Sequence, residues 1–300
     1  MFRWLLTGVG LAILLLLFAV VAELVLGSAN AFRVFGFDFL TNSIWDEGSD
    51  TYGALPFIAG TVMTSAIAML IAVPVGILTA LFLSEMAPQW LAVPLTFAVD
   101  LIAALPSVII GLWGLSVLSV VTRELIEVPV VSNFGALPFL GPNQGGSDLL
   151  TASLLLSLMV TPTIVSLTQE TFATIPQMHR EAMIGLGGTR WEVIRKVILP
   201  LSWGGISAAA ILALGRAMGE TMAVAMVIGN VDQVPSGLFD PAQTISSKIA
   251  LTWSEASIGL ETDSVVALGL CLLVVSVGMV LAARRLVRGR TLAALGVQTL

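Results

Sequence analysis

The chain has 300 residues, of which 57% are hydrophobic and only 11% are charged, and its mean hydropathy is +1.00. A soluble domain carries about a quarter charged residues, so this composition excludes a water-soluble fold and indicates a protein that lies largely in lipid. The net charge of −6 argues against a nucleic-acid-binding protein. Cys271 and His179 are the single residues of their types, which excludes a disulfide framework and a multi-histidine or multi-cysteine metal site.

Six segments are long and apolar enough to cross a bilayer, a crossing that needs about 20 residues. In chain order they are 5–27, 57–84, 94–122, 149–169, 203–229 and 264–284. The first follows Arg3 and resembles a signal peptide, but its apolar run exceeds the roughly 7–15 residues of a signal sequence, so we expect an uncleaved helix. The expected fold class is therefore all-α, a polytopic membrane protein with six transmembrane helices.

Basic residues mark one side of the predicted membrane domain. The N-terminus, the loop between the fourth and fifth spans and the segment after the sixth span hold nine of the 13 Lys and Arg residues. The positive-inside rule places these segments in the cytoplasm, so both termini are expected to be cytoplasmic. The outer loops contain most of the acidic residues, and the net negative charge therefore says little about the membrane core.

The segment 176–200, PQMHREAMIGLGGTRWEVIRKVILP, predicts two short helices joined by a tight turn. Pro176 suits the first turn of a helix, and Gly187 suits the left-handed conformation that ends one. Thr189 and Glu192 have the spacing of a capping box at the start of the second helix. Pro200 is expected to end that second helix.

The first of these helices has an apolar face, because Met178, Ala182, Met183 and Leu186 recur at helical spacing. Such a projection either inserts into a groove on a partner protein or lies on the membrane surface, where the basic residues of the loop would contact anionic lipid. The residues alone leave both possibilities open.

The same loop resembles the EAA loop of ABC-importer permeases. Its Glu181-Ala182-Met183, three residues, Gly187, nine residues, Val197, one residue and Leu199-Pro200 follow the family pattern Glu-Ala-Ala, three residues, Gly, nine residues, Ile, one residue, Leu-Pro. In that family the first helix docks in a cleft of a cytoplasmic ATPase. The resemblance therefore implies an ATPase-coupling role for the motif residues Glu181, Ala182, Met183, Gly187, Leu199 and Pro200.

Three further stretches resemble the phosphate-specific branch of that family. They are GTVMTSAIAMLIAVPVGILTALFLSEMAP within 53–88, LPSVIIGLWGL at 105–115 and LGRAMGETMAV at 214–224. The second is more similar to the PstC type of subunit than to its PstA-type partner. This resemblance implies a type I importer (MetI-like) permease fold, with residues 1–52 as a first helix and outer loop, 53–290 as the permease core and 291–300 as a cytoplasmic tail.

The resemblance also implies the partners and the location of the chain. These are phosphate, a PstA-type permease, a cytoplasmic ATPase dimer, an external phosphate-binding protein and the lipid of a bacterial plasma (inner) membrane. No nucleic acid and no cofactor are expected.

Arg216 and Glu220 are charges within the predicted fifth span, where a charge costs at least about 2.5 kcal/mol. A spacing of four predicts that both lie on one helix face and pair. Intramembrane charges mark substrate routes by default, and a guanidinium binds phosphate oxygens bidentately, so the pair predicts an anion translocation path. The family places an equivalent Arg and Glu in this motif. The alternative is a self-neutralised pair that joins two helices.

Asp100 and three prolines are weaker candidates. Asp100 lies near the inner end of the predicted third span, where it either takes part in the path or only reaches the interface or caps a helix. Pro74, Pro106 and Pro162 interrupt predicted spans and either kink helices around a cavity or belong to ordinary packing.

The sequence lacks the G-x-x-x-x-G-K-[ST] pattern of a phosphate-binding loop, since neither Lys196 nor Lys248 follows such glycines. We therefore expect no catalytic site in this chain and ATP hydrolysis in a separate subunit. The resemblance therefore implies a membrane permease subunit of an ATP-driven phosphate importer, which forms half of the translocation path. The alternatives are a permease for another oxyanion, the PstA-type subunit, a secondary transporter driven by an ion gradient, and a membrane scaffold without transport activity.

Overall fold

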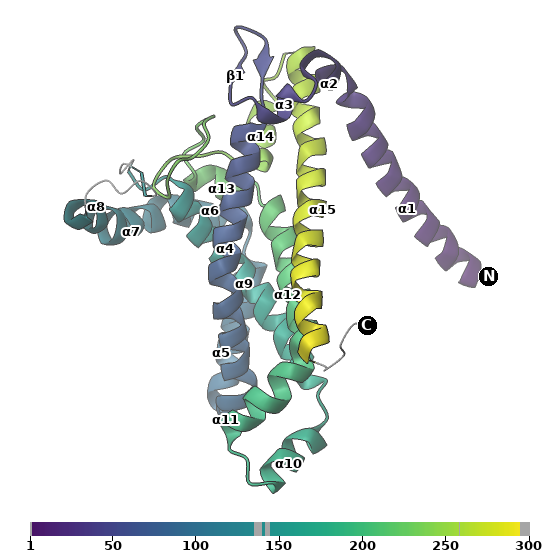
Figure 1. The fold of residues 1–300 in the computed structure, drawn as a ribbon, viewed down its shortest axis with the longest axis vertical. Coiled ribbons are helices and arrows are strands. Elements are labelled where there is room, and N and C mark those ends of the chain that lie inside the picture. Colours follow the sequence, from purple (N-terminus) through teal and green to yellow (C-terminus); the bar gives the residue numbers. More distant parts are fainter. Residues whose placement is uncertain (1, 135–139, 142–144, 258, 295–300) are drawn as a thin grey trace.

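The computed structural model describes residues 2–134, 140–141, 145–257 and 259–294 of the chain and is almost entirely helical (Figure 1). Six of its helical stretches are long and apolar enough to span a membrane, as the sequence predicts in number. They are Phe2–Phe35, Leu55–Met86, Ser107–Asn133, Leu149–Ala173, Arg190–Gly219 and Leu260–Arg285.

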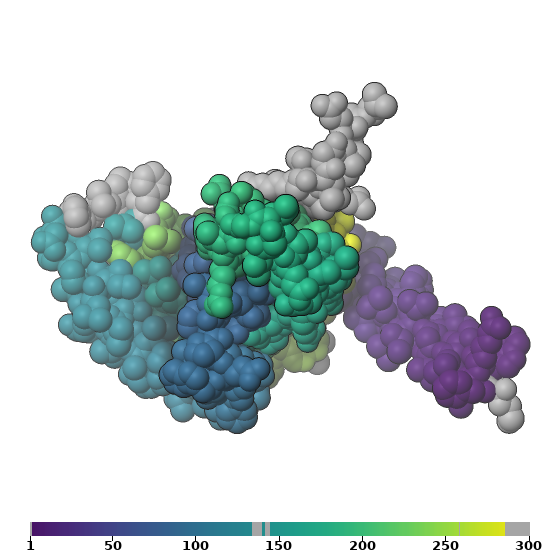
Figure 2. All heavy atoms as spheres, turned by 90° about the horizontal axis from the view of Figure 1, so that it is seen from below, coloured from purple at the N-terminus to yellow at the C-terminus, as the bar shows by residue number. Residues whose placement is uncertain are grey.

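Helix α1 (Phe2–Gly27) leaves the rest of the molecule as a separate arm (Figures 1 and 2). None of its residues is buried, and it packs only near its end, where α15 (Leu260–Ala294) and the short α2 (Ala29–Phe35) contact it. So large an apolar surface is stable in hydrocarbon rather than in water.

One end of the molecule is closed by short elements and aromatic packing. They are α3 (Asp38–Thr41), the antiparallel pair β1 (Trp45–Asp46) and β2 (Thr51–Tyr52), and α14 (Ile245–Thr252). Phe39, Tyr52 and Phe57 are buried there, and Trp45 packs edge-on to Tyr52 at 4.9 Å between ring centres. Lys248 lies over the Trp45 ring and pairs with Asp232 at 2.6 Å, which neutralises a cation that is nearly buried.

The central packing is made by α4 (Leu55–Leu81), α9 (Leu149–Ala173), α12 (Leu199–Gly219) and α13 (Met222–Val227). Alanines and branched aliphatic residues fill the space between them, as close approach of membrane helices requires. A second apolar cluster, which we call the lower cluster, joins the far ends of α4 and α9 to the start of α12. Its buried members are Ala80, Leu81, Leu83, Val165, Phe172, Ile175, Val193, Ile194, Ile198 and Ile206.

The predicted third span, 94–122, is wrong in its boundaries. The structure breaks it at Leu105-Pro106 into α5 (Gln89–Ala104), which is too short to span, and a longer stretch that begins at Ser107. Leu105 is extended, with ψ of 136°, because proline excludes the helical conformation from the residue before it. The second stretch consists of α6 (Ser107–Trp113), η2 (Gly114–Leu118), α7 (Ser119–Thr122), η3 (Arg123–Glu127) and α8 (Val128–Phe134). It lies crosswise to α4 and α15 (Figure 1).

The predicted fifth span, 203–229, is shifted relative to the structure. The continuous helix runs over Arg190–Gly219, through α11 (Arg190–Val193), the π-helical turn η4 (Ile194–Ile198) and α12. Pro200 does not end the second loop helix as expected, because the π turn widens the helix just before it. The Leu199 N–H bonds to the Ile194 carbonyl, five residues back, which relieves the clash between a proline ring and the preceding turn.

The 176–200 segment lies at the end of the molecule opposite the β1–β2 pair, and α4 continues toward it through the π turn η1 (Phe82–Met86) (Figure 1). The start of α1 and the end of α15 also point toward this end. Of the predicted tail 291–300, residues 291–294 belong to α15 and the others lie outside the described residues.

Candidate functional site

The loop between α9 and α12 has the helix–turn–helix form that its sequence predicts. Helix α10 (Gln177–Gly185) follows Pro176, and Gly187 adopts a φ of +84°. The N–H groups of Gly188 and Gly187 bond to the carbonyls of Met183 and Ile184, which is the Schellman arrangement that ends a helix. Thr189 and Glu192 form the predicted capping box at the start of α11.

Helix α10 has two faces with different environments. Met178, Glu181 and Ala182 are exposed on one face, together with Leu186 just beyond the helix, which is 85% exposed. Met183 lies on the opposite face and packs against the lower cluster. The residues of the sequence motif are therefore divided, because Glu181 and Ala182 are exposed whereas Met183 packs against the lower cluster.

Leu199 and Pro200, at the end of the motif, lie apart from the exposed face of α10. Leu199 packs against the lower cluster, and Pro200 occupies the first turn of α12. Their structural contribution is to fix how the loop enters the membrane helix.

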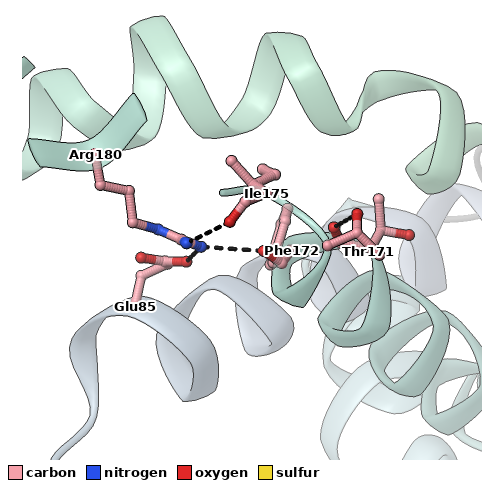
Figure 3. Close-up of polar contacts among 6 residues, drawn as sticks. Glu85, Thr171, Phe172, Ile175 and Arg180 are labelled. Carbon is pink, nitrogen blue, oxygen red and sulfur yellow. Dashed lines mark hydrogen bonds and ion pairs between the residues drawn. The ribbon is translucent and has the colours of Figure 1, made fainter. Parts of the chain in front are cut away.

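Arg180 makes the most extensive polar contacts of α10, and sequence reasoning did not single it out (Figure 3). Its guanidinium forms a salt bridge of 2.8 Å with Glu85 in η1, and it donates hydrogen bonds of 3.0 Å to the carbonyls of Phe172 and Ile175. The side chains of Arg180 and Glu85 are only 18% and 14% exposed. Because the two residues are 95 positions apart, no local sequence pattern identifies the pair.

A groove of about 400 Å³ opens beside this salt bridge, between α10, α11 and the end of α4. Its walls combine apolar and charged side chains. They are Glu85, Met86, Gln177, Arg180, Ile184, Arg190, Trp191, Val193 and Ile194. Trp191 is 60% exposed, so the loop offers an apolar surface beyond α10 itself.

Arg216 and Glu220 do not form the predicted pair on one helix face. Helix α12 ends at Gly219, and Glu220 is extended, with ψ of 129°. Arg216 lies in the last turn of α12, where its Nη1 donates to the Thr163 hydroxyl of α9 at 3.2 Å. The carboxylate of Glu220 instead accepts from the Ala223 N–H at 3.4 Å, at the start of α13.

This arrangement leaves the charge of Arg216 without a carboxylate partner among the described residues. Within the part of the chain that the structure describes, Arg216 forms no salt bridge, and its side chain lies on an exposed face of α12. The helix end partly offsets the cost of the cation, because the carbonyl end of a helix attracts positive charge. A guanidinium held by a neutral hydroxyl remains able to bind an anion.

Asp100 and the three prolines are the weaker candidates of the sequence analysis. Asp100 accepts a hydrogen bond of 3.3 Å from Ser166, which lies on the same helix as Thr163. Pro74 and Pro162 lie inside α4 and α9, whereas Pro106 marks the break before α6.

Comparison with known proteins agrees with this architecture. Residues 72–291 match the family model of the binding-protein-dependent transport system inner membrane component. The chain is 45% identical over 269 residues to the phosphate transport system permease protein PstC of Mesorhizobium japonicum, covering 88% of this chain and 82% of that protein. It is 40% identical to the protein of the same name from Haemophilus influenzae, covering 92% and 89% of the two chains.

A solved structure extends the likeness to the fold. A chain from the bacterial alginate ABC transporter, crystallised with its pentasaccharide-bound periplasmic protein, aligns with a TM-score of 0.65 at 20% identity and covers 96% of this chain and 95% of that one. The predicted all-α permease fold is therefore confirmed. The chain belongs to the family of binding-protein-dependent transport system inner membrane components, within its group of PstC-type permeases.

Proposed function

We propose that this chain is one of two membrane subunits of an ATP-driven phosphate importer, in which it forms half of the translocation path. The similarity to PstC permeases supports phosphate as the cargo. The structural observation that carries an anion path is the uncompensated guanidinium of Arg216, held by Thr163 beside the break between α12 and α13. Glu220, next to that break, completes the proposed path.

The energy in this proposal comes from a separate ATPase dimer that docks on the exposed face of α10, with Glu181 and Ala182 in the contact and Gly187 setting the turn behind it. ATP binding closes the dimer, α10 moves with it, and the path alternates between its two openings. A PstA-type permease is the second membrane subunit, and an external phosphate-binding protein delivers the cargo.

The proposed orientation places α10 and both termini in the cytoplasm of a bacterium whose plasma (inner) membrane holds the chain. The direction of α1 and α15 supports it, because the start of the first and the end of the second point toward the α10 end of the molecule. The basic residues Arg180, Arg190, Arg195 and Lys196 also lie at this end.

Reconstitution in vesicles with the PstA-type permease, the ATPase and the binding protein tests the cargo. We expect phosphate to stimulate ATP hydrolysis and to accumulate in the vesicles, whereas sulfate and molybdate do neither. Stimulation by sulfate or molybdate alone would assign the chain to another oxyanion. Phosphate accumulation that persists without the ATPase, driven by an ion gradient, would contradict the ATP-driven mechanism.

A further inference from the structure

A docking helix transmits motion only if it is firmly attached to the helices that must move. The backbone of α10 packs against α11 and η4, both of which belong to the stretch that leads into α12. The attachment of α10 to α4 and α9 depends on side chains that reach these helices from the face of α10 opposite its exposed face. Met183 supplies apolar contact with the lower cluster, and Arg180 supplies the polar contacts.

One guanidinium joins three points of the chain at this position (Figure 3). Nη2 of Arg180 contacts both the Glu85 carboxylate at 2.8 Å and the Phe172 carbonyl at 3.0 Å, while Nη1 donates to the Ile175 carbonyl at 3.0 Å. Glu85 belongs to the continuation of α4, and Phe172 belongs to the last turn of α9. The rigid planar fork of arginine directs these three contacts from two nitrogens, whereas lysine would have to make them from a single nitrogen.

The surroundings strengthen these contacts. Both charged side chains are more than four-fifths shielded from solvent, so salt and water weaken their attraction less than at an open surface. The Phe172 carbonyl lies in the last turn of α9 and the Ile175 carbonyl lies two residues beyond it, at the carbonyl end of the helix, which attracts a cation.

Helix α9 connects this contact with the proposed path. Phe172, which accepts from Arg180, and Thr163, which accepts from Arg216, lie nine residues apart on the same helix. At 1.5 Å per residue the separation is about 14 Å along the helix axis. A displacement of α10 that is transferred to the end of α9 therefore reaches the residue that holds Arg216.

We propose that Arg180 is a positioning residue that fastens the docking helix α10 to the ends of α4 and α9, with Glu85 as its partner on α4; this role rests on the importer function proposed above. Arg180 acts through the attachment of α10, not through contact with the cargo. Its loss uncouples ATP hydrolysis from transport while the exposed face of α10 still binds the ATPase.

A double-mutant cycle in the reconstituted complex tests the functional part. We expect Arg180→Ala and Glu85→Ala each to lower phosphate uptake per ATP hydrolysed at least tenfold, with the ATPase still co-purifying. The double variant should be no worse than Arg180→Ala alone, because Arg180→Ala already removes the contact that Glu85→Ala removes. The control is Lys196→Ala, which removes a more exposed salt bridge of equal length, to Glu192, and should stay within twofold. Wild-type coupling in Arg180→Ala, or losses that multiply in the double variant, would overturn the proposal.

A distance measurement separates the positioning role from the importer function. Spin labels at His179→Cys on α10 and Gln89→Cys at the start of α5, in a Cys271→Ser background, report how firmly α10 is held in the full chain in lipid nanodiscs. We expect Arg180→Ala to broaden the distance distribution and Lys196→Ala to leave it unchanged. An unchanged distribution in Arg180→Ala would overturn the anchoring role even if uptake fell. A wild-type complex that takes up no phosphate would contradict the proposed function, while the width of the distribution still decides the anchor.

Discussion

At the scale of single residues, the surroundings of Arg216 determine what its charge can do. The guanidinium is held by one hydroxyl, that of Thr163, and lies in the last turn of α12, whose carbonyl end stabilises a cation by roughly 0.3–1 kcal/mol. A carboxylate partner would neutralise it, whereas a hydroxyl orients it and leaves its charge for an anion. This distinction favours a binding role over a purely structural pair.

Glu220 forms no salt bridge with Arg216 among the described residues, and its proposed place is beside the path. A negative charge beside the path lowers the local concentration of anions. We therefore expect Glu220→Gln to lower the apparent KM for phosphate about fivefold, which corresponds to the loss of about 1 kcal/mol of repulsion in a well-screened site. Initial rates of uptake in vesicles at graded phosphate concentrations measure the change. The amide keeps an acceptor for the Ala223 N–H, so the start of α13 is preserved. A higher KM in Glu220→Gln would show that the carboxylate assists phosphate binding instead.

The spacing of Arg216 and Glu220 shows where residue-level prediction reaches its limit. Four positions bring side chains together only while the helix continues, and here the chain leaves the helix at Gly219. The sequence singles out both charged residues, but the partner of Arg216 is Thr163 in α9, which is remote in the sequence. Arg180 and Glu85 escape prediction for the same reason.

At the scale of elements, the α10 loop was predictable because its determinants are local. Pro176, Gly187 and the Thr189–Glu192 capping box lie within a few residues of the boundaries that they set. The left-handed Gly187 and the capping box are as expected, whereas Pro176 lies at the N-cap, just before the first turn of α10. The break before Pro106 is also local, since proline restricts the residue before it. The prediction failed there because apolar sequence on both sides of the break resembles one continuous span.

The π turns are a different case. Four of them, η1, η2, η3 and η4, lie within longer described helices, and η4 directly precedes Pro200. Proline marks a possible irregularity but not its form, because either a helix end or a widened turn relieves the clash. The structure uses the widened turn, so α11 continues through η4 into α12 as one helical stretch.

The turn at Gly187 offers a test at this scale. A β-branched residue at φ of +84° is strained by about 1–3 kcal/mol, so Gly187→Val should distort the end of α10 and lower phosphate-stimulated ATP hydrolysis about tenfold. The permease should still insert in the membrane, because the spans are unchanged. Gly187→Asn is the matched control, since asparagine tolerates this conformation, and should retain most of the activity. Equal activity in both variants would contradict a role for the turn.

At the scale of the whole molecule, the sequence predicts the number of candidate spans and the fold class but not the arrangement of the helices. Composition alone distinguishes lipid from water as the solvent, and hydropathy locates the apolar runs. The crosswise course of α6–α8 and the separation of α1 from the body have no such signal, because they depend on packing between distant segments (Figures 1 and 2).

The proposed orientation is testable on the whole chain in cells. In a Cys271→Ser background, a membrane-impermeant maleimide should label Ser49→Cys, in the turn between β1 and β2, in intact spheroplasts. It should label His179→Cys on α10 only after the membrane is permeabilised. Both positions are exposed, so access is limited by the membrane rather than by burial. The reverse pattern would place the α10 loop outside and remove it from any cytoplasmic ATPase.

The proposed ATP-driven anion path through Arg216 is tested by phosphate uptake into vesicles that contain the complete transporter. The measurement compares the wild type with Arg216→Ala and uses Arg33→Ala, an exposed arginine of α2, as the control for loss of one positive charge. We predict that uptake falls at least about 30-fold in Arg216→Ala, because a charged hydrogen bond to the anion contributes roughly 2 kcal/mol, while the ATPase remains bound. Arg33→Ala should match the wild type. Uptake at the wild-type rate in Arg216→Ala would show that the anion does not pass by way of Arg216.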